Sequence, residues 1–119
     1  MSNAATRPFT LDEYQQSASR TAVYPARNQF HGILYTSVAL AGEVGEFCNL
    51  VKKVARNHDG VPPLEMIEAM SEELGDVLWY VSQAAVELGL SLDQIAVENL
   101  AKLSRRKEEN KLKEDQHRA

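Results

Sequence analysis

The sequence predicts an all-α protein, a four-helix bundle whose two long central helices carry acidic motifs. Apolar residues recur at helical spacing through most of the chain, and no stretch alternates apolar and polar residues as a β-strand does. Turn-forming residues divide this apolar pattern into four segments. With 119 residues, the chain has the length of one domain and can bury a core of its own.

The first helix is expected over residues 11–21. Thr10 precedes it and Glu13 follows three residues later, which is the capping-box pattern. In that pattern each side chain accepts a hydrogen bond from the other residue's backbone N–H. Pro25 then interrupts the helical pattern and predicts a connecting loop before the second helix.

The second helix is expected over residues 30–57 and is apolar almost all round. Its apolar residues include Ile33, Leu34, Val38, Leu40, Val44, Phe47, Leu50, Val51 and Val54. A helix of that kind needs cover on several sides, and a chain this short has few helices to give it. We therefore expect a homo-oligomer, either a homodimer or a homotetramer.

The third helix is expected over residues 63–88, with Gly89 as its C-terminal cap. Ser91 and Gln94 form a second capping box that opens the fourth helix. The apolar stripe of that helix ends at Leu103, and from there the sequence becomes almost entirely polar and charged. The last part of the chain is therefore expected to fray or to be disordered.

These elements predict a single domain over residues 10–106. Residues 1–9 are expected to be a disordered or expression-derived terminus, and residues 107–119 a charged C-terminal tail. The net charge of −4 gives no support for nucleic-acid binding, and no segment has the apolar length of a membrane span. The single Cys48 lies in an apolar helix, where we expect it to be buried, and it fits a cytoplasmic location.

Two pairs of carboxylates define the candidate site. Glu43 with Glu46, and Glu73 with Asp76, are each spaced so that both members share one helical face. The same faces carry the apolar residues Leu40, Phe47, Leu50 and Val54 in one helix and Met66, Met70, Val77, Tyr80 and Ala84 in the other. Carboxylates on core-facing stripes are costly unless something compensates their charge.

Three interpretations of these pairs remain open: a solvated charged face, buried ion pairs with Lys or Arg, or a site for hard cations. We favour the cation site, because the carboxylates share the apolar stripe. No histidine or cysteine falls beside the pairs, which favours Mg²⁺, with Mn²⁺ as a substitute. The Glu114–His117 pair lies in the polar tail, so the ferritin-like di-iron pattern is not met.

Cationic and amide side chains could complete a site for phosphates. Lys53 lies two turns beyond Glu46, and Asn99, Lys102 and Arg106 share one face of the fourth helix. If the fourth helix covers the acidic pairs, these residues supply a wall that binds phosphate oxygens. Alternatively, the lysines neutralise the carboxylates or extend into solvent.

The acidic motifs and the residues around them resemble those of a known protein family. The segments 40–46, 73–80 and 99–103 resemble those of the MazG-like nucleotide pyrophosphohydrolases, within the all-α NTP pyrophosphatase superfamily. The resemblance covers about residues 11–106. It implies Mg²⁺-dependent hydrolysis of a nucleoside or deoxynucleoside triphosphate to the monophosphate and pyrophosphate, by metal-activated water that attacks the α-phosphorus.

The resemblance also implies roles for individual residues. Glu43, Glu46, Glu73 and Asp76 would bind the metal, and Glu43 or Glu46 would accept the proton of the attacking water. Gly42 stands where many members carry a further acid. Lys53, Asn99, Lys102 and Arg106 would bind the phosphates. From their positions in the sequence, Tyr80 on the carboxylate face and His31 at the entry to the second helix could bind the base, and His31 could equally cap that helix. Trp79 is instead expected in the core or an interface.

Two other classes of function compete with this hypothesis. The chain could be a non-catalytic helical regulator that binds metal or nucleotide, or an interaction module with an acidic pocket. A pyrophosphohydrolase of another phosphorylated metabolite is a third alternative. The four carboxylates argue against the interaction module, but they do not separate binding from turnover.

Overall fold

The computed structural model describes residues 9–25, 27 and 29–118. The described residues form no strand, so the predicted all-α class is confirmed, whereas all but Phe9 of the predicted 1–9 terminus lies outside the described part. The helices are α2 (Leu11–Ser19), α3 (Phe30–Asn57), α4 (Leu64–Glu87) and α5 (Leu92–Arg118).

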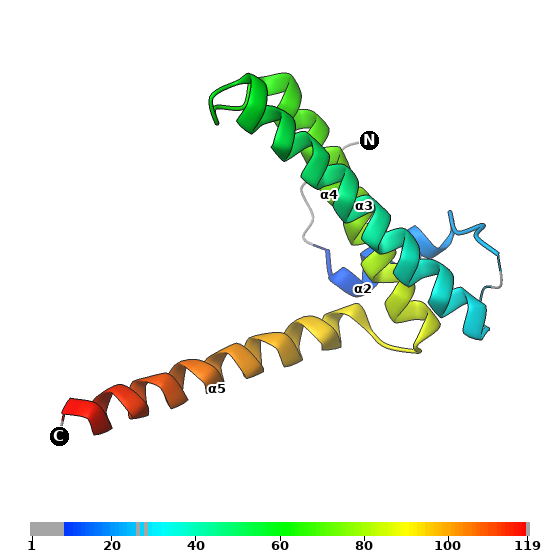
Figure 1. Ribbon diagram of the computed structural model, residues 1–119. Helices are drawn as coiled ribbons and strands as arrows, with labels where there is room; N and C mark the ends of the chain where they lie inside the picture. Colours follow the sequence, from blue (N-terminus) through cyan, green and yellow to red (C-terminus); the bar gives the residue numbers. More distant parts are fainter. Residues whose placement is uncertain (1–8, 26, 28, 119) are drawn as a thin grey trace.

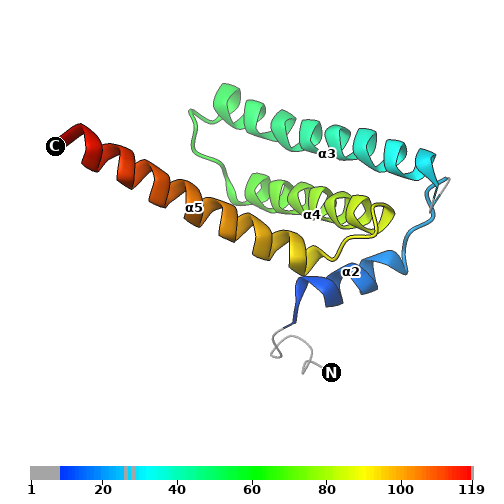
Figure 2. The same cartoon turned by 90° about the horizontal axis from the view of Figure 1, so that it is seen from below.

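Helices α3 and α4 form a long antiparallel hairpin, which is the most extensive helix contact of the chain (Figures 1 and 2). The turn between them begins where the His58 N–H bonds the Val54 carbonyl at 3.0 Å. Asp59 and Gly60 then adopt positive φ angles of 52° and 79°, a backbone region that glycine occupies at little cost. This reversal lays the two acidic motifs side by side.

Helix α2 lies against α4 and the start of α5. Its predicted capping box is present, because the Thr10 side chain accepts from the Glu13 N–H and the Glu13 side chain accepts from the Thr10 N–H. Asp12 of α2 holds the N-terminus of α5. Its carboxylate accepts hydrogen bonds from the Ser91 hydroxyl at 2.8 Å and the Asp93 N–H at 2.9 Å. These bonds fix the direction in which α5 leaves.

Helix α5 extends away from the α3–α4 hairpin instead of covering it (Figure 1). The condition under which its polar and cationic residues would face the acidic pairs is therefore not met within one chain. The expected fraying is wrong, because α5 continues as a helix to Arg118. Strong helix formers and the absence of Gly and Pro explain this length, together with bonds such as that from Gln94 to Glu98 at 3.0 Å.

Much apolar surface stays uncovered in the single chain. On α5, Val97 is 60% exposed and Leu100 is 67% exposed. Exposed apolar residues of α3 and α4 include Leu34, Val38, Val44, Val51, Ile67, Leu74 and Leu78. Cys48 is exposed as well, which corrects the expectation that it is buried. Among the described residues, no helix is long and apolar enough to cross a bilayer.

Candidate active site

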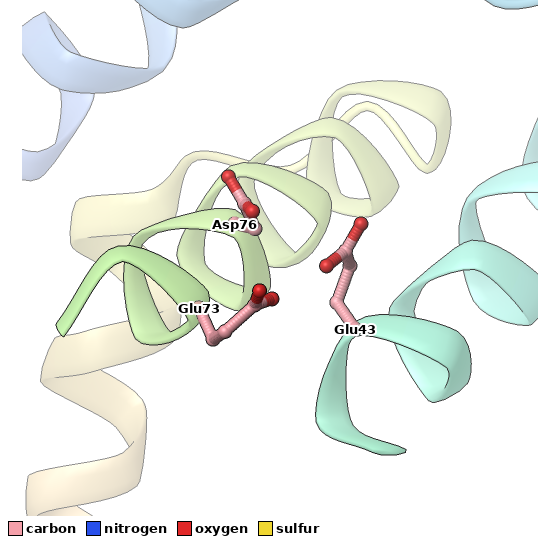
Figure 3. A group of neighbouring side chains, drawn as sticks. All are labelled: Glu43, Glu73 and Asp76. Atoms are coloured by element: carbon pink, nitrogen blue, oxygen red, sulfur yellow. The ribbon is translucent and has the colours of Figure 1, made fainter. Parts of the chain in front are cut away.

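Three carboxylates converge between the two central helices. Figure 3 shows Glu43 of α3 pointing toward Glu73 and Asp76 of α4. One carboxylate oxygen from each residue lies within 4.8 Å of the others. Glu43 and Glu73 are half-buried, whereas Asp76 is exposed. The structure thus brings together residues from both acidic motifs.

Glu46 is the fourth acid of the motifs and lies outside this group of three. It is exposed one turn farther along α3. Its charge nevertheless acts on Glu73, where it contributes to a raised pKa. Three of the four predicted carboxylates therefore form the group, with Glu46 at its margin.

The electrostatics of Glu73 distinguish between the interpretations of the acidic pairs. Burial is the largest cause of its raised pKa, followed by a hydrogen bond with Glu43 and the charges of Glu43, Asp76 and Glu46. No lysine or arginine is among these influences, so the buried ion pair is not the environment of this carboxyl. Its Oε2 is buried and has no hydrogen-bond partner in the described part of the chain.

A divalent cation fits this arrangement. An unpaired buried oxygen surrounded by other carboxylates is unfavourable, and a cation would compensate both the lost solvation and the repulsion. The donors are all oxygen atoms, as hard cations such as Mg²⁺ and Mn²⁺ require. Three carboxylates also leave coordination positions for water or phosphate.

A cavity of about 330 Å³ opens beside the group and is lined by Glu43, Asp76, Trp79 and Tyr80. Tyr80 was predicted on this face, and its pKa is raised by burial first and then by Tyr35 and Glu43. Trp79 was expected in the core or an interface, away from the face of the carboxylates. That expectation is wrong, because Trp79 lines this cavity. The signal was available, because Trp79 follows Asp76 by three residues, the spacing that joins Glu73 to Asp76.

The aromatic wall continues away from the carboxylates, which the sequence did not indicate. Tyr24 lies edge-on to Trp79 with ring centroids 6.2 Å apart, and it stacks on Tyr35 at 5.7 Å. The Tyr24 hydroxyl donates to the Glu87 carboxylate. Burial and this carboxylate raise the pKa of Tyr24 to about 12.

The predicted phosphate-binding residues are not gathered at the acidic group within the chain. Lys53 is exposed on α3, ten residues beyond Glu43 and therefore about 15 Å along the helix. Asn99, Lys102 and Arg106 are exposed on α5, which extends away from the hairpin. A single chain thus presents the carboxylates without the cations that would face phosphate.

His31 is exposed in the first turn of α3 and does not line the acidic cavity. It borders a different, apolar cavity of about 320 Å³ with Pro25, Leu34, Tyr35 and Val38. Its ring meets that of Phe30 edge-on at 6.0 Å. The structure therefore places His31 outside the cavity beside the carboxylates, and its role at the base stays a prediction.

Much of the chain, including these carboxylates, is similar to known proteins. Residues 33–110 match the model of the MazG nucleotide pyrophosphohydrolase domain, a range that includes all three converging carboxylates. The Gene 37 protein of Mycobacterium phage L5 is 43% identical over 101 residues, covering 82% of this chain and 89% of that protein.

The dCTP pyrophosphatase 1 of Mus musculus is 32% identical over 107 residues. That similarity covers 82% of this chain but 62% of the mouse protein, so the chain spans less than two thirds of that relative. No solved structure matches the chain.

Proposed function

Because the chain belongs to the MazG nucleotide pyrophosphohydrolase family, we propose that it hydrolyses nucleoside or deoxynucleoside triphosphates to the monophosphate and pyrophosphate with Mg²⁺. The observation that carries the proposal is the convergence of Glu43, Glu73 and Asp76 around an unpaired buried oxygen. The name of the mouse relative makes dCTP the first substrate to test. A cytoplasmic location is part of the proposal and fits the single cysteine.

In this proposal Glu43, Glu73 and Asp76 hold the metal, and Mn²⁺ can replace Mg²⁺. When bound, such an ion polarises phosphate oxygens and makes a neighbouring water more acidic. The protein's contribution is to hold its carboxylates in place on two rigid helices, so that little reorganisation accompanies the reaction. The half-buried position of Glu43 and Glu73 limits competing solvent.

The proton of the attacking water needs an acceptor. Glu43 and Glu46 are the candidates, and Glu46 lies outside the group of three, so it is free to take the proton. The position before Glu43 offers no further acid, since it is Gly42, and a Cβ there would meet no atom within 4 Å. Attack at the α-phosphorus then expels pyrophosphate.

A partner subunit would supply the missing cations. We place Asn99, Lys102 and Arg106 of a second copy against the acidic group, because α5 presents them beside exposed apolar side chains such as Leu100. Burying that surface would stabilise a homodimer or homotetramer, and the opposite charges of Lys102 and the carboxylates would set its register.

The test is a screen of common nucleotides with Mg²⁺ in which pyrophosphate and orthophosphate are measured separately. We expect pyrophosphate and monophosphate in equal amounts and no activity with a chelator. Glu73→Gln should abolish release, whereas Glu72→Gln, a change of the exposed neighbouring acid, should not. Tight nucleotide binding without turnover would indicate a regulator instead of an enzyme.

A further inference from the structure

The cavity beside Glu43 and Asp76 has an aromatic wall that is unsuited to metal or phosphate. Its volume of about 330 Å³ lies within the range of roughly 300–1,000 Å³ that is typical of small-molecule sites. Trp79 and Tyr80 form the wall, with their rings nearly perpendicular and their centroids 4.9 Å apart. Rings of this kind bind planar, apolar groups through their π surfaces.

The indole of Trp79 is fixed by a hydrogen bond to the turn that follows α2. Its Nε1–H donates to the Thr21 hydroxyl at 3.0 Å. That hydroxyl in turn donates to the Ala18 carbonyl at 2.7 Å, so it accepts one hydrogen bond from Trp79 and donates another. An indole has a single hydrogen-bond donor, and Thr21 engages it. Trp79 can therefore act on a ligand only through its ring surface.

A second contact holds the same ring. Tyr24, which is buried and tied to α4 through Glu87, lies edge-on to Trp79. The indole is thus constrained by Thr21 and Tyr24 before any ligand arrives. A ring that is already ordered loses little entropy on binding, which favours its use as a contact surface.

We propose that Trp79 is a specificity-determining residue of this site, against which the base of the nucleotide stacks, and that Thr21 is its positioning residue. This inference rests on the proposed function. Since the indole donor is occupied, Trp79 recognises the presence of a base without reading its hydrogen-bond pattern. It separates nucleotides from base-free polyphosphates, and loss of one stacking contact weakens binding about tenfold.

The protein carries its own probe, because Trp79 is its single tryptophan. The ligands are α,β-methylene-dCTP, whose scissile bond cannot be hydrolysed, and inorganic tripolyphosphate, each with Mg²⁺. We expect the nucleotide to quench Trp79 emission and tripolyphosphate to leave it unchanged. Trp79→Leu should raise the KM for dCTP about tenfold with a smaller effect on kcat, and leave competitive inhibition by tripolyphosphate unchanged.

Milder variants test the same idea without removing the ring from the fold. Trp79→Phe keeps an aromatic surface and should retain most of the affinity for dCTP. Thr21→Val keeps the shape but neither accepts nor donates, so it should raise the KM toward that of Trp79→Leu and shift the Trp79 emission. Thr21→Ser keeps a hydroxyl that can make both hydrogen bonds. The KM for dCTP and the Trp79 emission of this variant should therefore match those of the parent.

The outcomes separate this inference from the proposed function. If Trp79→Leu weakens the binding of dCTP and of tripolyphosphate equally, or weakens the binding of neither, the stacking role is overturned while the proposed enzymatic activity stands. If Thr21→Val behaves as the parent does, Thr21 is not a positioning residue. If the parent binds neither ligand with Mg²⁺, the proposed function fails and this inference fails with it.

Discussion

Glu43 of α3 and Glu73 of α4 face each other across the central hairpin, with carboxylate oxygens within 4.8 Å. Their proximity raises the pKa of Glu73 in addition to the effect of its burial. Like charges held this close destabilise a fold unless a cation joins them. The stability of the protein should therefore respond to divalent metal and to removal of either charge.

Mg²⁺ should stabilise the parent and not Glu73→Gln. At about 100 times its dissociation constant, a ligand of the folded state alone adds roughly 2.7 kcal/mol to the free energy of unfolding. Without metal, Glu73→Gln should melt no lower than the parent, because the substitution removes repulsion. Thermal melts of both proteins with and without Mg²⁺ measure this. A strongly destabilised variant and a parent indifferent to Mg²⁺ would make Glu73 a scaffold residue.

Active sites should be completed between subunits, which mixed oligomers can reveal. Glu73→Gln and Lys102→Ala should each be nearly inactive alone. A random mixture of the two in dimers should regain about a quarter of the parent activity, because half the dimers are mixed and each has one intact site. Lys111→Ala, an exposed lysine farther along α5, serves as the control and should stay active.

Light scattering accompanies that experiment, since the proposal requires an assembly larger than one chain. A stable monomer at micromolar concentration would refute the shared site. Absence of any regained activity in mixtures that demonstrably contain both variants would place Lys102 at the site of its own chain.

Acid should loosen the junction between α2 and α5. The Asp93 N–H and then the Ser91 hydroxyl lower the pKa of Asp12 from its ordinary value of 3.8. A depressed pKa contributes stability that is present above the unfolded value and is lost as pH falls through the folded one. Urea unfolding at pH 7 and near pH 3 should show a smaller loss for Asp12→Asn than for the parent. Equal losses would contradict the role of Asp12.

The helices and the acidic faces could be predicted because they depend on local spacing. Apolar periodicity and the turn residues that flank the segments predicted the bounds of α3 and α4 to within a residue or two. The pairing of Glu43 with Glu73 and Asp76 then followed from an antiparallel hairpin. The position of Glu46 could not be predicted, since a shared helical face does not fix the distance to the neighbouring helix.

The course of α5 depends on contacts that no local pattern reveals. Asp12 and Gln15 of α2 bind the residues just before and at the start of α5, including the Ser91 hydroxyl and the Leu90 carbonyl. These contacts join segments far apart in sequence and set the angle of the helix. The same holds for Trp79, whose position depends on a hydrogen bond that it donates to Thr21, in the turn after α2.

The most direct measurement follows the oxygen of water into the products. Hydrolysis of dCTP with Mg²⁺ in ¹⁸O-labelled water should place the label in the monophosphate, because water attacks the α-phosphorus. The label should disappear with a chelator and in Glu73→Gln, but persist in Glu72→Gln. Label in pyrophosphate or orthophosphate, or an undiminished rate in Glu73→Gln, would contradict a metal site built from Glu43, Glu73 and Asp76.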